Sequence, residues 1–244
     1  MKEPIRKHWV LVCVLFALAA GAGFAWAGAP QNPEIQERVA EIKQAAAQNK
    51  QLLAQYTWVE QVTIILKGEE KKQEHFQVRL GPDGKPQKTS MDQPQPQATD
   101  SGGRRGRLKR HIIEEKTEEY KAYTDQIKAL IQQYVPPDKD MLSQAYQQGN
   151  VMMGPEAAAP GEYRLVISNY LKKGDKMTLI MDKAQKDLVG LSIATYLNDP
   201  SDAVNVSVQF SRLTGGPNHV STQTINGVKK QLTINIQNSD YQKL

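Results

Sequence analysis

The chain has 244 residues, a net charge of +5 at pH 7 and a single cysteine, Cys13. One cysteine excludes a disulfide within the chain, so a fold of this length must be held together by an apolar core. The mild positive charge, without an accompanying basic motif, does not indicate nucleic-acid binding.

The first 27 residues are organised like a secretory signal peptide. Three basic residues within positions 2–7 precede an uncharged apolar run from Trp9 to Pro30, and positions 25–27 read Ala-Trp-Ala. Small residues at these two places are what signal peptidase recognises, so we expect cleavage after Ala27 and a periplasmic or secreted protein. An uncleaved inner-membrane anchor stays open as the alternative, because about 20 apolar residues suffice to cross a bilayer.

The remaining residues, 28–244, are expected to form one domain that begins with a helix over residues 32–53. Asn32 is a suitable N-cap, and Pro33 suits the first helical position. Apolar residues recur at three- and four-residue spacing and form one stripe that must be buried against another element. The stripe consists of Ile35, Val39, Ile42, Ala46 and Leu53.

Three strands are predicted to follow this helix. From Tyr56 to about Leu66 the apolar period becomes two residues, which indicates a half-buried strand. A second strand carries Phe76, Val78 and Leu80, and the turn signal at residues 81–84 leads into a short third strand.

Residues 92–107 are predicted to be a disordered loop, because their Gln-Pro and Ser-Gly-Gly stretches cannot bury a core. The basic run from Arg104 to Arg110 could contact an anionic membrane surface or a protein partner. A solvated loop tip is the alternative, since blocks of like charge are usually solvated.

Two further helices are predicted in the middle of the chain. The first covers residues 108–134 and ends before Pro136 and Pro137, because proline cannot continue a helix. Asp138 caps the second, which closes at Gly149. The segment from Val151 to Gly161 is predicted to be a loop.

The last third of the chain, from Tyr163, predicts six short strands separated by turn signals, of which Asn226-Gly227 is the strongest. Apolar and polar residues alternate along these strands, so one face of an antiparallel sheet is dry. The helical stripes are available to cover it. We therefore predict an α+β fold, a curved antiparallel sheet of about nine strands forming an incomplete barrel with helices packed on its concave face.

This order of elements resembles the LolA/LolB-like superfamily of periplasmic lipoprotein carriers. The segment from Leu179 to Leu191 resembles the strand–Asp–turn–strand step of those proteins, and residues 215–241 resemble their closing hairpin. The resemblance implies an incomplete barrel, lidded by helices, that holds acyl chains or another hydrophobic ligand.

Six residues are candidates to line such a ligand cavity. Methionine side chains are flexible and apolar, which suits an adaptable cavity, although filling gaps in a core is their more usual role. Trp58 could stack on a ligand or anchor the first helix to the sheet. The candidates are Trp58, Met141, Met152, Met153, Met177 and Met181.

Sequence motifs for catalysis are missing. His75, His111 and His219 lack metal-ligand spacing, and neither a Gly-x-Ser-x-Gly elbow nor a phosphate-binding loop occurs. We therefore expect neither an enzyme nor a bound cofactor or metal. The sequence predicts an exported carrier or binding protein for a hydrophobic ligand, a lipid or a lipoprotein acyl chain. The alternative is an envelope interaction protein with a filled barrel.

Overall fold

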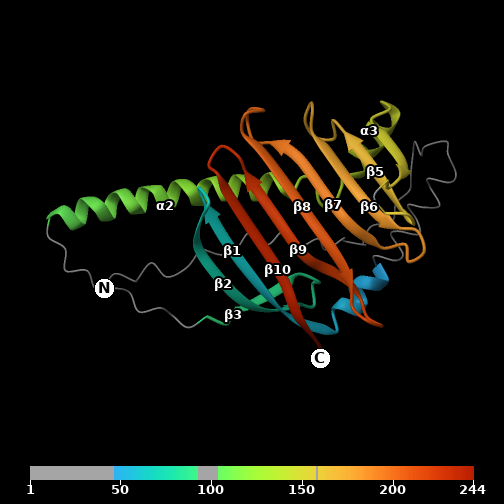
Figure 1. Cartoon of the computed structure of the whole chain (residues 1–244), viewed down its shortest axis with the longest axis horizontal. Helices are drawn as coiled ribbons and strands as arrows, with labels where there is room; N and C mark the ends of the chain where they lie inside the picture. Colours follow the sequence, from blue (N-terminus) through green and yellow to red (C-terminus); the bar gives the residue numbers. More distant parts are fainter. Residues whose placement is uncertain (1–46, 93–103, 158) are drawn as a thin grey trace.

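One antiparallel sheet of ten strands, with helices on one face, dominates the structure (Figure 1). The computed structural model describes residues 47–92, 104–157 and 159–244, with the backbone alone for 104–117 and residue 139. Its helices are a short segment at 47–53, α2 (Arg104–Ile131) and α3 (Lys139–Gln147). The strands are β1 (Tyr56–Leu66), β2 (Glu69–Leu80), β3 (Pro86–Ser90), β4 (Val151–Pro155), β5 (Glu162–Ser168), β6 (Lys176–Asp182), β7 (Leu188–Tyr196), β8 (Ala203–Arg212), β9 (Asn218–Gly227) and β10 (Leu232–Lys243).

The strand order is β3-β2-β1-β10-β9-β8-β7-β6-β5-β4, and every neighbouring pair is antiparallel. β3 and β4 are the two edges, so the sheet curves without closing into a barrel. The predicted α+β class and open curved sheet are confirmed. The chain returns from β3 through α2 and α3 to the far edge at β4, and the meander then brings β10 back beside β1.

The strand count is ten where about nine were predicted, because part of the predicted loop from Val151 to Gly161 is a strand. β4 pairs with β5 from Val151 opposite Ile167 to Pro155 opposite Tyr163. Proline lacks a backbone N–H and is tolerated at a sheet edge, where one side of the strand has no neighbour to bond. The Gly and Pro residues that indicated a loop are therefore compatible with an edge strand.

Helix α2 starts earlier than predicted. Residues 104–107, which were assigned to the disordered loop, form its first turn. Arginine and leucine are good helix formers, and the unfavourable helix dipole costs only about 0.3–1 kcal/mol. The rest of that loop (93–103), the signal peptide and most of the first predicted helix lie outside the described residues.

The predicted cap of α3 is confirmed. The Asp138 carboxylate accepts hydrogen bonds from the backbone N–H groups of Asp140 at 3.0 Å and Met141 at 3.1 Å. Gly149 follows the helix with a φ of 72°, a left-handed conformation that glycine adopts without strain.

The position of the last hairpin turn differs from the prediction. Asn226 and Gly227 are the final residues of β9, and the turn itself is formed by residues 228–231. Gly227 serves helix packing instead: a Cβ there would lie 2.6 Å from Cε1 of Tyr123 and 2.8 Å from Cδ1 of Ile127. The glycine lets α2 approach the sheet backbone closely.

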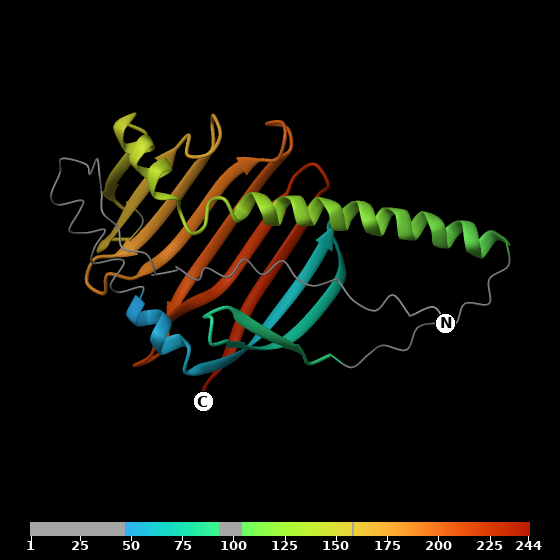
Figure 2. The same cartoon turned by 180° about the vertical axis from the view of Figure 1, so that it is seen from behind.

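Helix α2 crosses the concave face at one end of the strands (Figure 2). Its buried stripe contains Tyr123, Ile127, Leu130 and Ile131. The helix ends at Ile131, three residues before the predicted end, and the buried Tyr134 lies in the turn that follows. The Tyr123 hydroxyl donates to Asp202 at 2.7 Å, and the Tyr134 hydroxyl donates to Asp175 at 2.6 Å. Both aspartates are buried just before a strand begins, so they fix the helix to the starts of β8 and β6.

Replacing Gly227 with alanine should destabilise the protein. The added methyl group would push α2 away from β9, and overpacking of this kind costs about 1–3 kcal/mol. Urea unfolding followed by circular dichroism measures the change. Gly154→Ala is the matched control, because a Cβ at Gly154 in β4 meets no atom within 4 Å. Equal stabilities of the two variants would contradict the close approach of α2.

Candidate functional site

A row of polar residues crosses the otherwise apolar concave face, and we call it the polar lane: Lys88, Glu60, Asn238 and Gln223. Glu60 in β1 lies directly opposite Asn238 in β10. Gln223 in β9 lies opposite Ile236, two residues before Asn238 on the same face. Three adjacent strands thus place an acid and two amides side by side. Glu60 and Asn238 lie six positions from the Leu66–Leu232 pair, which adjoins Gly227 and α2.

Glu60 interrupts the apolar alternation of β1. Its neighbours on the same face, Trp58 and Val62, are buried, and Glu60 is buried with them. Across the strand pair with β2, Glu60 faces Phe76 and Trp58 faces Val78. A carboxylate in this position loses its hydration and needs a partner within the protein.

The partner of Glu60 comes from the edge strand β3. Lys88 lies opposite Val78, and its side chain reaches over the Phe76 ring, with Nζ 5.9 Å from the ring centroid, to form an ion pair with Glu60. The side chains of Lys88 and Glu60 are only 8% and 3% exposed. Curling of β2 and β3 over the concave face makes this contact feasible (Figure 2).

Burial shifts both members of the pair towards neutrality. Desolvation raises the pKa of Glu60 to about 7 and, together with the charge of Lys128 on α2, lowers the pKa of Lys88 to about 7. The attraction within the ion pair opposes both shifts, so desolvation sets their direction.

An aromatic cluster flanks the lane. The rings of Trp58 and Tyr241 stack with their centroids 5.5 Å apart and an angle of 16° between their planes. The His219 ring lies 4.0 Å from Tyr241, and burial lowers the pKa of His219, which favours the neutral imidazole. The Tyr241 hydroxyl donates to the carbonyl of Val220 at 3.3 Å. These rings give the lane an apolar wall.

Tyr241 reaches this cluster because β10 contains a bulge. The pairing with β1 shifts register between Thr57 and Val59, and Asp240 adopts a left-handed φ of 52°. Without the bulge, strict alternation from Ile236 would turn Tyr241 to the convex face.

Three buried polar atoms at the lane have no hydrogen-bond partner among the described residues: Trp58 Nε1, Gln223 Nε2 and Asn238 Oδ1. Trp58 is 2% exposed and Gln223 is 3% exposed. A buried donor left unpaired costs about 1–3 kcal/mol. The lane therefore offers two donors and one acceptor within the described fold.

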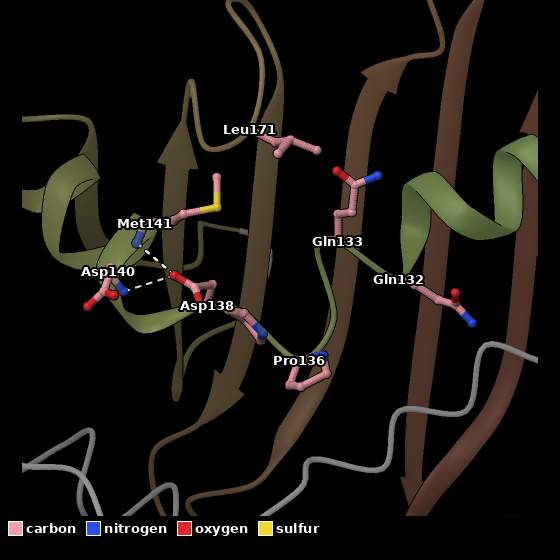
Figure 3. A pocket seen from close by; sticks show the side chains of 8 residues that line it. Gln132, Gln133, Pro136, Asp138, Asp140, Met141 and Leu171 are labelled. Carbon is pink, nitrogen blue, oxygen red and sulfur yellow. Dashed lines mark hydrogen bonds between the residues drawn. The ribbon is translucent and has the colours of Figure 1, made fainter.

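A separate hollow of about 600 Å³ lies between the end of α2 and the start of α3 (Figure 3). It is open to solvent, and its lining is half polar and half apolar residues. One oxygen of Asp138 in its wall is already committed to the α3 cap. The lining residues are Gln132, Gln133, Pro136, Pro137, Asp138, Asp140, Met141 and Leu171.

The six predicted cavity residues do not lie together. Only Trp58 belongs to the lane region, and only Met141 lines the hollow of Figure 3. Met177 and Met181 are buried in β6, which four strands separate from β1. Met152 and Met153 lie on the edge strand β4, 65% and 47% exposed, and not on a loop that could act as a lid.

Sequence reasoning missed the lane itself. Glu60 and Gln223 occupy positions where the alternation of β1 and β9 demands apolar residues, and that interruption was the available signal. Lys88 and Tyr241 gave no such signal, because their positions depend on the curl of β3 and the bulge at Asp240.

Other site types receive no support within the described ranges 47–92, 104–157 and 159–244. No group of three or more His, Cys, Asp or Glu side chains there could hold a metal ion. In the same part of the chain, no helix combines the length and apolar character needed to span a bilayer.

Comparison with known proteins yields one structural likeness. No protein-family model matches the sequence, and no curated protein matches it. The fold is similar to the crystal structure of a DUF1329 family protein from Desulfovibrio piger, with a TM-score of 0.40 and 10% identity over 84% of this chain and 93% of that one. A likeness of this degree assigns neither family nor function, so membership of the lipoprotein-carrier superfamily stays a prediction.

The Glu60–Lys88 pair should behave as a unit in a double-mutant cycle. Glu60→Met or Lys88→Met alone leaves a buried ionisable partner behind and should cost about 3 kcal/mol, whereas the double variant should lie close to the wild type. Urea unfolding at pH 7 measures the three free energies. The control is the exposed ion pair of Glu69 and Lys71. Replacing either residue with methionine should change the free energy of unfolding by less than about 1 kcal/mol. Additive losses in the double variant would exclude a coupled pair.

Proposed function

We propose that this chain is an exported, periplasmic binding or carrier protein for a hydrophobic ligand, a lipid or a lipoprotein acyl chain, held on the concave face of the sheet. The observation that carries the proposal is that, among the described residues, the long helix α2 covers only one end of the concave face. The contacts of α2 lie at one end of the strands, with Gly227, Asp202 and Asp175. The aromatic cluster and the lane lie towards the other end.

The composition of the concave face supports an acyl ligand. Around the lane the face is formed by aliphatic and aromatic side chains from adjacent strands, so a bound chain would lose its hydration along its length. They are Trp58, Val62, Phe76, Val78, Val208 and Ile236. Specific polar groups within an apolar surface are typical of small-molecule sites.

Export is proposed from the N-terminal sequence. The basic start, the apolar run and the Ala-Trp-Ala exit at 25–27 support a signal peptide, and a carrier released after Ala27 could diffuse between membranes. Membrane contact through an uncleaved N-terminus or the basic run Arg104–Arg110 remains part of this proposal as an alternative route to a lipid surface.

A second candidate is an envelope interaction protein with a filled interior. Met177 and Met181 are buried within the core, as the gap-filling role of methionine predicts. The outer edge of β4 exposes Met152, and an exposed strand edge can pair with an extended partner segment. This candidate requires that the concave face take up no ligand.

Binding of N-phenyl-1-naphthylamine, an apolar fluorophore, separates the two candidates. The carrier should bind the dye saturably, and Tyr241→Ala should weaken binding about fivefold because it removes the ring stacked on Trp58. Fluorescence titration of the purified protein gives the Kd.

The matched control is Tyr196→Ala, which removes a tyrosine from β7, at the end of the strands that α2 covers. It should leave the Kd unchanged. No saturable binding to the wild type, or equal losses in both variants, would contradict the carrier and favour the filled interior.

A further inference from the structure

We propose that the polar lane is a head-group site, specific for an uncharged acyl lipid whose head combines carbonyl and hydroxyl oxygens, such as a monoacylglycerol. This inference rests on the proposed function, because it names the class of ligand that the concave face holds. It depends on the unpaired buried atoms of the lane and on the charge already present there.

The unpaired atoms define the hydrogen bonds that a ligand must supply. Trp58 Nε1 and Gln223 Nε2 are donors, so the head group needs two acceptors, which an ester carbonyl and a hydroxyl provide. Asn238 Oδ1 is an acceptor and needs a donor, which the same hydroxyl or a second one provides. The other end of that amide is already used, since Asn238 Nδ2 donates to the Val220 carbonyl at 2.9 Å.

Burial makes these hydrogen bonds decisive for selectivity. A head group that reaches Gln223 leaves water, whereas the protein atoms it meets are already buried. In a site of low dielectric constant each satisfied hydrogen bond is strengthened, and each unsatisfied group is costly. An alkyl chain without a polar head would leave all three atoms unpaired and should bind less tightly than the matching glycerol ester.

The charge of the lane favours an uncharged head over an ionic one. The Lys88 ammonium is already paired with Glu60, so an anionic head would meet the Glu60 carboxylate and compete with it for Lys88. A cationic head would meet Lys88 and the two N–H donors. Either ion would lose its hydration and have to disrupt the Glu60–Lys88 pair to gain a partner, which costs more than burying a neutral polar group.

The position of the lane suits an amphipathic ligand. Val62 and Ile236 lie opposite each other, one pair along from Glu60 and Asn238 on the same face. The Trp58–Tyr241 stack lies on the opposite side of Glu60 along β1. A head group on the lane therefore has apolar surface on both sides, over which an acyl chain can extend.

Competition against N-phenyl-1-naphthylamine tests the inference with three probes of equal chain length: 1-decanoylglycerol, decanoate and decylamine. The wild type should bind 1-decanoylglycerol most tightly at pH 7. Gln223→Met keeps an unbranched side chain but removes the donor, so it should weaken 1-decanoylglycerol about fivefold relative to the dye. The same variant should raise the thermal midpoint of the ligand-free protein, because it removes an unpaired buried amide.

Gln237→Met is the matched control, since Gln237 is exposed on the same sheet, and it should change neither affinity nor stability. If the dye binds but decanoate or decylamine competes better than the glycerol ester, the head-group inference fails and the carrier stands. If Gln223→Met weakens dye and ester equally, or leaves the ester unaffected, the inference also fails. If neither the dye nor any probe binds, the proposed function itself fails.

Discussion

The anchoring of α2 to one end of the sheet is the constraint on which the rest of the structure depends. Tyr123 lies in α2 and Tyr134 in the turn that follows it, and their hydroxyls bond two buried aspartates that precede β8 and β6. Asp175 also accepts hydrogen bonds from the backbone N–H groups of residues 170–172. These bonds hold its carboxylate in place independently of Tyr134. Gly227 then sets how closely the helix lies against β9.

This anchoring divides the concave face into two regions with different chemistry. The region under α2 is closed by aliphatic side chains and by tyrosines whose burial raises their pKa, so they remain neutral donors. The other region combines an aromatic stack, a buried ion pair and amides with unused hydrogen-bonding capacity. Purely structural sheets rarely retain such unpaired atoms, because each one lowers stability. We therefore propose the second region as the place where a ligand binds.

Much of the fold could be predicted from the sequence because it follows from local periodicity. Alternation along β6, β7, β8 and β10 identified the sheet and its dry face, and Asp138 identified the start of α3. The wrong predictions share one cause, which is contact with elements that are distant in the sequence. Val151–Pro155 forms a strand because it pairs with β5 at the edge of the sheet. Gly227, which was predicted to form a turn, instead allows the close packing of α2. The site was mostly missed, since a bulge and a curled edge strand bring Tyr241 and Lys88 to Glu60.

Photoaffinity labelling tests the central claim, that ligands bind the region of the concave face beyond α2. A monoacylglycerol carrying a diazirine in its acyl chain would be bound, irradiated and located by peptide mass spectrometry. The account predicts that labelled residues fall within β1 and β10, Tyr56–Leu66 and Leu232–Lys243, and that excess unlabelled 1-decanoylglycerol protects them. Protected labelling confined to the hollow between α2 and α3, at Met141 and Leu171, would contradict it.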